Sequence, residues 1–275
     1  YGARLIHSFL GDNSTVSCCE LLNHLIFPAH EQHHNNSFLV AALVGGQSNI
    51  AAGATIGSNH NSRSNDNEII AGRGFWPGLS TTLKHSSRFA SFILVSKGDY
   101  PAELDLPLPF ALLANNVTLG RLEVTPAFWW TRNMYALARN NWKFAARDRR
   151  IHRQQNIHFD AFAPDTVEEI IAARRLIEEW VGATLAGDTP RWDAVPGMYP
   201  AIVASRDSET VRARQKAGRA LLSESDGDFP VVSVAGLEKS HRLSVLVRPD
   251  EGWQAYGEML HHYAARQLTA YLTAH

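Results

Sequence analysis

The sequence predicts a protein of mainly β structure with an α-rich C-terminal part: a parallel β-helix in residues 1–126, followed by a helical region in residues 127–275. Two observations predict this order. Apolar residues recur every six positions in the first part, and helical spacing replaces that period near residue 127. A period of six fits neither the helical period near 3.6 nor simple strand alternation.

Three runs carry the period of six: Phe38, Val44, Ile50 and Ile56; Leu10, Val16, Leu22 and Pro28; and Leu83, Phe89 and Val95. Small and turn-prone residues flank these positions, so the backbone can bend every few residues. Each hexapeptide is expected to form one short strand and one corner, with the periodic residue pointing inward. Three hexapeptides complete a coil of about eighteen residues, and coils stack as parallel strands about 4.8 Å apart.

Three stretches interrupt the period and are expected to be loops, at about residues 28–37, 57–69 and 97–110. The last is rich in proline. Loops that leave a rigid scaffold are where such folds place functional residues.

Downstream, helical spacing and capping residues predict four helices. They cover about residues 131–154, 164–187, 208–224 and 250–273. On the first, Met134, Leu137, Ala138, Asn141, Trp142 and Ala145 recur on one face. The stretches "FPVVSVAG" and "HRLSVLVRP" each predict a short strand.

Several longer stretches show a resemblance to a known family. They are "HHNNSFLVAALVGGQSNIAAGATIGSNHNSR", "IIAGRGFWPGLSTTLKHSSRFASF", "KGDYPAELDLPLPF" and, near the end, "GLEKSHRLSVLVRPDEGWQAYGEMLHHYAARQL". The hexapeptide runs resemble the left-handed β-helix of bacterial hexapeptide acyltransferases and of sugar nucleotidyltransferase C-terminal halves. More narrowly, the stretches resemble an uncharacterised family of bacterial hexapeptide-repeat proteins, a domain of unknown function (DUF4954). The resemblance implies the fold more firmly than the chemistry.

Composition predicts a cytoplasmic protein. The net charge of −1 gives no general attraction to nucleic acid or to a membrane surface. No apolar run approaches the length of a membrane helix, and no signal peptide opens the chain. Cys18 and Cys19 are adjacent, so we expect two reduced thiols. The start "YGARLIHSFLG" reads as part of a coil, which predicts further coils upstream.

Histidines in the predicted loops are the candidate catalytic groups. His34 lies in "EQHHNNS", and His60 lies in "GSNHNSR" beside Asn59, Asn61 and Arg63. Hexapeptide acyltransferases use a histidine as general base, so the resemblance implies this role for His60 or His34. The alternative is that these histidines cap turns or stack with asparagines along a corner.

The same residue type permits a second chemistry. His34, His60 and His85 could hold a zinc ion with one position left for water. Their spacings of 26 and 25 residues are near one coil plus a loop. The short His-x4-His element of β-helix carbonic anhydrases, which carry such a site, is absent. The preferred reading therefore has no metal.

Candidate binding residues accompany the histidines. Arg63, Arg73 and Arg88 could bind phosphate groups of a nucleotide sugar or of coenzyme A, and His85 lies near Arg88 in "LKHSSR". Trp76, in "GRGFWPG", could stack on a base or sugar, although filling a corner of the coil is the commoner role of such a side chain.

The first predicted helix is strongly basic. Its cations are Arg132, Arg139, Lys143, Arg147, Arg149, Arg150 and Arg153, against Asp148 alone. With no nucleic-acid motif in the sequence, we interpret this helix as lying against the acidic side of its neighbour or of the β-helix, with Trp142 and Phe144 as packing residues.

Two functions of different classes remain open. The first is a transferase that moves an acyl group from a coenzyme A thioester, as co-substrate, to a sugar or nucleotide sugar. It would need no covalently bound cofactor and could act as a homo-oligomer. The second is a non-catalytic β-helix that binds sugar nucleotides or serves assembly. Fold alone does not choose between them.

Overall fold

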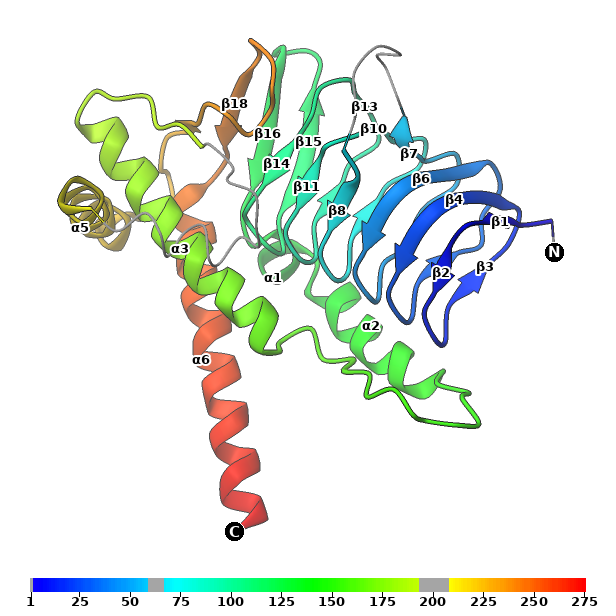
Figure 1. The fold of residues 1–275 in the computed structure, drawn as a ribbon. Helices are drawn as coiled ribbons and strands as arrows, with labels where there is room; N and C mark the ends of the chain where they lie inside the picture. Colours follow the sequence, from blue (N-terminus) through cyan, green and yellow to red (C-terminus); the bar gives the residue numbers. More distant parts are fainter. Residues whose placement is uncertain (1, 59–66, 193–207) are drawn as a thin grey trace.

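The computed structural model describes residues 2–58, 67–192 and 208–275. An N-terminal β-solenoid of about six turns is followed by a helical C-terminal region, so the predicted fold class is confirmed (Figure 1). The helices lie along one side and one end of the solenoid, and the last helix projects away from it.

Three ladders of short parallel strands form the three faces of the solenoid. The first face pairs β1 (Arg4–Ile6), β4 (Cys19–Ile26), β6 (Ser37–Val44), β7 (Thr55–Ser58), β10 (Thr82–Lys84) and β13 (Asp99–Tyr100). The second pairs β2 (Phe9–Leu10) with the ends of β4 and β6, and then β8 (Ile69–Ala71), β11 (Arg88–Phe89) and β14 (Asp105–Leu106). The third contains β3 (Thr15–Val16), β5 (Glu31–Gln32), β9 (Trp76–Pro77), β12 (Leu94–Val95) and β15 (Leu112–Asn116).

The interior of the solenoid is a set of stacked apolar columns. On the first face Leu21, Leu39, Ile56, Leu83 and Tyr100 are successive register partners, and all are fully buried. One coil cannot bury its own interior, so each residue is covered by its partners above and below. This stacking supplies the core that the sequence period predicts.

Two residues predicted to point inward do not. Leu22 and Phe38 are half-buried, whereas their neighbours Leu21 and Leu39 are fully buried. Side chains alternate across a strand, so a shift of one residue exchanges the two faces. The corner before β4, at Cys18, and the corner within β6, at Ala41, are each one residue shorter than the hexapeptide pattern requires, and both turn with positive φ. The rest of the run that begins at Phe38 and the whole of the third run keep their phase: Val44, Ile50, Ile56, Leu83, Phe89 and Val95 are all buried.

Two of the predicted loops are in fact coils. Residues 28–37 contain β5 and a buried polar interior, in which His30 and Gln32 are fully buried. Residues 97–110 contain β13 and β14 and form the sixth coil. The apolar period does not reveal the coil at residues 28–37, because a glutamine takes its interior position. It does not reveal the coil at residues 97–110, because prolines, which are accepted at strand ends, occupy its corners.

The third predicted loop contains an insertion in the coil. Ile56 and Leu83 are register partners although twenty-seven positions separate them, against eighteen between Leu21 and Leu39. Residues 59–66 of this insertion lie outside the described residues.

The third face continues into the C-terminal region. β16 (Arg121–Thr125) pairs antiparallel with β15, β18 (Leu243–Leu246) pairs parallel with β16, and β17 (Val232–Ser233) pairs antiparallel with β18. Both strands predicted in this region are therefore confirmed. One sheet therefore joins the two regions predicted from the sequence. Its coils end at β15, which forms an antiparallel hairpin with β16.

The helices are α1 (Phe128–Arg132), α2 (Met134–Ala146), α3 (Pro164–Leu185), α5 (Glu209–Glu224) and α6 (Pro249–Ala274). Three of the four predicted helices match α3, α5 and α6. The fourth prediction, one helix over 131–154, was wrong: it breaks at Asn133 and ends at Ala146. Beyond that end Asp148 accepts hydrogen bonds from the backbone and side chain of Arg150. These local hydrogen bonds stabilise a turn in place of further helix.

The basic helix packs on the solenoid, as expected. Lys143 of α2 forms an ion pair with Glu31 of β5, and Leu137 and Phe144 are buried. Trp142, predicted to pack, is instead 72% exposed. Leu137 belongs to the apolar face predicted from the sequence, so the buried face of α2 overlaps the predicted one and extends toward Phe144 instead of Trp142.

Candidate functional site: a cleft between the solenoid and the C-terminal strands

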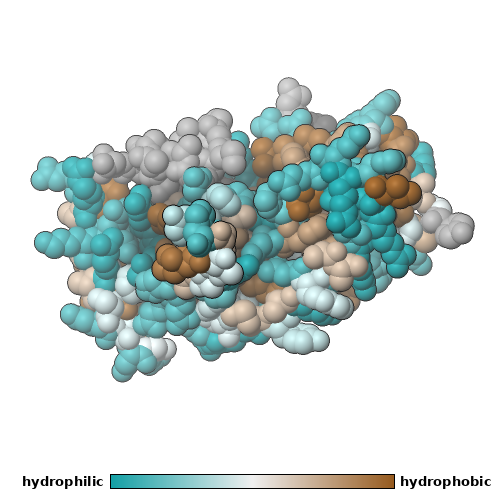
Figure 2. Space-filling model, turned by 90° about the horizontal axis from the view of Figure 1, so that it is seen from below, coloured by the Kyte–Doolittle hydropathy of each residue, from teal (hydrophilic) through white to brown (hydrophobic). Residues whose placement is uncertain are grey.

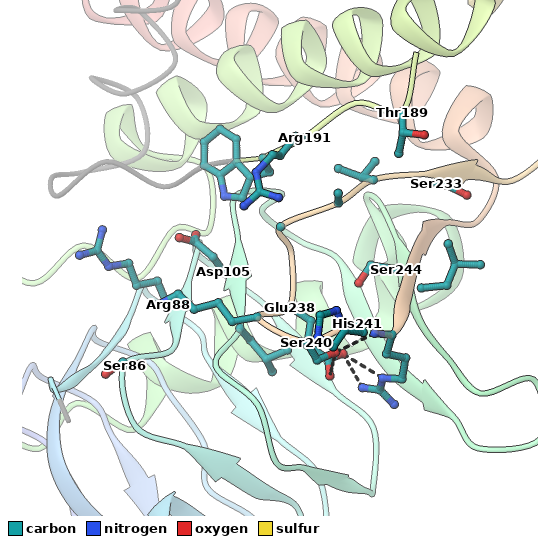
Figure 3. A pocket seen from close by; sticks show the side chains of 18 of the residues that line it. Ser86, Arg88, Asp105, Thr189, Arg191, Ser233, Glu238, Ser240, His241 and Ser244 are labelled. Carbon is teal, nitrogen blue, oxygen red and sulfur yellow. Dashed lines mark hydrogen bonds and ion pairs between the residues drawn. The ribbon is translucent and has the colours of Figure 1, made fainter. Parts of the chain in front are cut away.

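A cleft of about 1110 Å³ lies where the coils that contain β8, β11 and β14 meet the C-terminal region (Figure 3). Three parts of the chain line it: the outer side of the second face, the segment after α3, and the stretch from Ser233 to Ser244. Residues more than a hundred positions apart therefore share one site. Clefts between structural units are common ligand sites.

Strand alternation sets the solenoid wall of the cleft. Ile70, Arg88 and Asp105 are successive register partners on β8, β11 and β14, and their side chains line the cleft. The next residue of each strand, such as Phe89 or Leu106, is buried in the core. Adjacent strands lie about 4.8 Å apart, so these three side chains form a short column of fixed spacing.

Backbone pairing holds the opposite wall against this column. Leu104 and Glu238 form an antiparallel bridge, and the amide of Asp105 donates to the carbonyl oxygen of Leu237 at 2.9 Å. The amide of Lys239 donates to Glu103 at the same distance. The wall therefore continues the hydrogen bonding of the sixth coil.

A glycine fixes the position of the segment after α3. The amide of Trp192 donates to the carbonyl oxygen of Ala235 at 2.7 Å, and Arg191 and Ala235 form a parallel bridge. The following Gly236 has φ +91°, and a Cβ there would lie 1.8 Å from the carbonyl oxygen of Trp192. Only glycine permits this approach, which brings Arg191 to the edge of the cleft.

One ion pair in the cleft is structural. The carboxylate of Glu238 is 3% exposed and accepts from Arg242 Nε at 3.0 Å and from Ser240 at 3.1 Å. Arg242 also donates to Asn115 on β15 at 2.5 Å. Because Glu238 is buried and its partners surround it, this pair braces the wall.

The remaining charges give the cleft a slight excess of cations. Arg88, Arg191 and Lys239 line it together with the carboxylates of Glu68 and Asp105. Hydroxyl groups of Ser86, Thr189, Ser233, Ser240 and Ser244 add neutral hydrogen-bonding capacity (Figure 3). Such a mixture suits a ligand that carries both phosphate and hydroxyl groups.

His241 is the only histidine among the described residues that line the cleft, and it is exposed. It follows the braced Glu238 and Ser240 and lies beside them in Figure 3. An accessible imidazole next to hydroxyl-rich walls is a candidate proton acceptor.

The residues singled out from the sequence are not gathered at one place. Arg88 lines the cleft. His60, Asn59, Asn61 and Arg63 lie outside the described residues, although Asn67 and Glu68, which follow them in the chain, line the cleft. His34 is exposed between β5 and β6, and its ring centroid lies 4.5 Å from that of His33.

Arg73, Trp76 and His85 lie elsewhere. Arg73 donates two hydrogen bonds to Asp165 of α3, and Trp76 packs against Trp129 with ring centroids 5.6 Å apart. His85 is buried, and a Cβ on Gly57 would approach its ring to 3.0 Å. Within the described residues no group of histidine, cysteine and acidic side chains is arranged to hold a metal ion.

Sequence reasoning missed Arg191, Lys239 and His241. Arg191 lies in a part of the chain with no recognisable motif, and Lys239 and His241 lie in the C-terminal stretch that carries the family resemblance. Only the pairing of Ala235, Leu237 and Glu238 with distant backbone brings them to the solenoid. The prediction of short strands nearby and the resemblance of that stretch were the available signals.

Comparison with known proteins identifies a relative. An uncharacterised protein of Treponema pallidum is 49% identical over 267 residues, which cover 94% of this chain and 33% of that protein. The chain thus spans about a third of the length of the curated relative it matches. No protein-family model and no solved structure match the chain. Among the described residues, no helix is long and apolar enough to cross a membrane.

Proposed function

We propose that the protein binds a phosphate-bearing sugar, such as a nucleotide sugar, in the cleft between the solenoid and the C-terminal strands. The observation that carries this proposal is the convergence of Arg88, Arg191 and Lys239, from three distant chain segments, on one cavity lined with hydroxyl groups. Arginine binds phosphate through paired hydrogen bonds, and serine and threonine hydroxyls suit sugar hydroxyls.

The reaction proposed for this site is acyl transfer from a coenzyme A thioester. It rests on the resemblance of the hexapeptide runs to bacterial acyltransferases and on proposed membership in the uncharacterised family described above. His241 takes a proton from a sugar hydroxyl as its oxygen attacks the thioester carbonyl. The new C–O bond replaces the C–S bond, and the proton passes to the departing thiolate.

The rigid parts of the cleft support this assignment. Glu238 and Arg242 brace the segment that carries His241, and the β-ladder fixes Arg88. Catalytic and binding groups need such support, because an error of about 1 Å in their placement costs much of the rate.

A titration of the purified chain with a UDP-sugar, a dTDP-sugar and coenzyme A tests the binding step. Replacing Arg191 or Lys239 with glutamine should weaken binding about ten-fold or more, since each change removes a charge-assisted hydrogen bond. Arg4→Gln is the matched control, because Arg4 is exposed on the first coil, far along the solenoid ladder from the cleft. Equal affinity in all of these variants would contradict the proposed site.

A thiol-release assay with acetyl coenzyme A tests the reaction. His241→Asn should lose turnover and keep sugar binding, because the histidine acts in the chemical step. Unchanged turnover in His241→Asn would reject it as the base. Sugar binding with no turnover in the wild type would favour the non-catalytic binding module.

A further inference from the structure

The exposed face of α2 carries two aromatic residues and an arginine in a row. Tyr135 is 80% exposed and Trp142 is 72% exposed, and Arg139 lies between them on the same face. Positions 135, 139 and 142 follow the i, i+4, i+7 spacing of one helical face, with Ala138 at i+3 also exposed. We call these four residues the α2 outer face.

No residue of the described chain covers this face. Tyr135, Arg139 and Trp142 make no side-chain hydrogen bond, ion pair or ring contact with any described residue. Figure 2, which views the molecule from below, shows a mainly hydrophilic surface broken by smaller patches of intermediate and high hydropathy. An exposed tryptophan and tyrosine on one helix face leave a large apolar area in contact with water.

The inner face of the same helix is firmly attached. Leu137 and Phe144 are buried, Lys143 pairs with Glu31, and Asn141 accepts from the amide of Ala161 at 3.1 Å. The outer face is therefore presented by a fixed helix. A rigid helix pays little ordering entropy when it docks.

We propose that the α2 outer face inserts into an apolar groove of a protein partner whose rim carries carboxylates. The residue types are those that dominate binding energy at protein interfaces: tryptophan, tyrosine and arginine. Their spacing is that of helices that bind in grooves, with the aromatic anchors about 10 Å apart along the axis.

Charge complementarity specifies the acidic rim. From Phe128 to Ala146 the sequence has no Asp or Glu, and Arg139 has no ion-pair partner in the described chain. Arg149, three residues beyond the end of α2, also has no ion-pair partner in the described chain. A partner that buried this face against neutral or basic groups would leave the arginines without compensation.

The test begins with a photo-reactive benzoylphenylalanine at Ala138 of the full chain in the source cells, with the same residue at Ala270 of α6 as the control position. A protein that cross-links at 138 alone is then purified and titrated against the unlabelled chain. Trp142→Ala should weaken its binding about 30-fold or more, as expected for a central anchor. Arg139→Glu should weaken it further than Arg139→Lys.

Two control variants keep the test specific. Tyr271→Ala removes an exposed aromatic residue of α6, and Arg4→Glu reverses an exposed charge on the first coil; both should leave the affinity unchanged. The proposal is overturned if the purified protein binds Trp142→Ala and Arg139→Glu as tightly as wild type. It is also overturned if position 138 cross-links only to nucleic acid, lipid or a second copy of this chain, or to nothing.

Discussion

Arg73 and Asp165 join the solenoid to α3 through a two-pronged ion pair. Arg73 Nε lies 2.7 Å from one carboxylate oxygen of Asp165, and Nη2 lies 3.1 Å from the other. Nη1 donates to Gln47 and to the carbonyl oxygen of Asp160, and the guanidinium lies over the ring of Phe92. The side chain of Arg73 thus connects two neighbouring coils to α3 and to the segment that precedes α3.

Arg73→Ala should lower the free energy of unfolding by about 2 kcal/mol, because it breaks a partly buried pair and leaves Gln47 with fewer partners. The guanidinium side chain is 17% exposed. Arg4→Ala is the control, since its pair with Glu20 is largely exposed and worth under about 1 kcal/mol. Urea denaturation of both variants measures the difference, and equal losses would contradict the role assigned to Arg73.

Glu169 makes stability depend on pH near neutrality. It accepts a hydrogen bond from the amide of Ser91 at 2.9 Å. Burial raises the pKa of its carboxyl group to about 7, despite the opposing effect of that hydrogen bond. The folded chain therefore holds a proton that the unfolded chain, with an ordinary carboxyl pKa, has released.

The contribution of Glu169 to stability is consequently full below about pH 4.5 and is lost as the pH rises toward 7. Glu169→Gln should flatten this part of the stability–pH curve, because glutamine cannot ionise. Thermal unfolding between pH 5 and 8 measures the slope. A slope as steep as that of wild type would show that the proton resides elsewhere.

His30 gives a dependence of opposite sign. It is fully buried, its Nε2 lies 3.1 Å from Gln32 Oε1, and Gln32 donates to Ser37 at 3.0 Å. Burial lowers the pKa of the imidazole to about 4. The His30 imidazole therefore binds a proton below about pH 6.5 in the unfolded chain and only below about pH 4 in the folded chain.

Stability should therefore fall as the pH drops from about 6.5 to 4. His24, whose pKa burial also lowers, adds to the same loss. His30→Gln should reduce the acid sensitivity without abolishing it, since His24 remains. Acid titration of ellipticity for both chains would reveal this, and identical acid midpoints would contradict it.

Gly236 controls the geometry of the cleft. Gly236→Ala should cost about 2 to 4 kcal/mol, because φ is +91° and the new Cβ would collide with the backbone of Trp192. Gly227→Ala is the matched control: its φ is +103°, yet a Cβ there meets nothing within 4 Å. If denaturation costs the two variants equal stability, steric contact at Trp192 does not matter.

Spacing in the sequence was enough to predict the coils. Residues such as Val44, Ile50 and Phe89 repeat because each coil must bury the same interior point, so a local pattern records a regular fold. The exceptions are local too. Leu22 and Phe38 fell out of phase because two corners are one residue short, and Gln32 concealed a coil because its interior position is polar.

The sequence by itself determined the solenoid, the helices α3, α5 and α6, and the basic character of α2, because periodicity, caps and charge are local properties of the chain. Tertiary structure alone decided that Arg88 would line the same cleft as Arg191 and His241, and that Arg73 would pair with Asp165 of α3. Those outcomes depend on backbone pairs between residues far apart, such as Leu104 with Glu238, and no local pattern encodes such pairs.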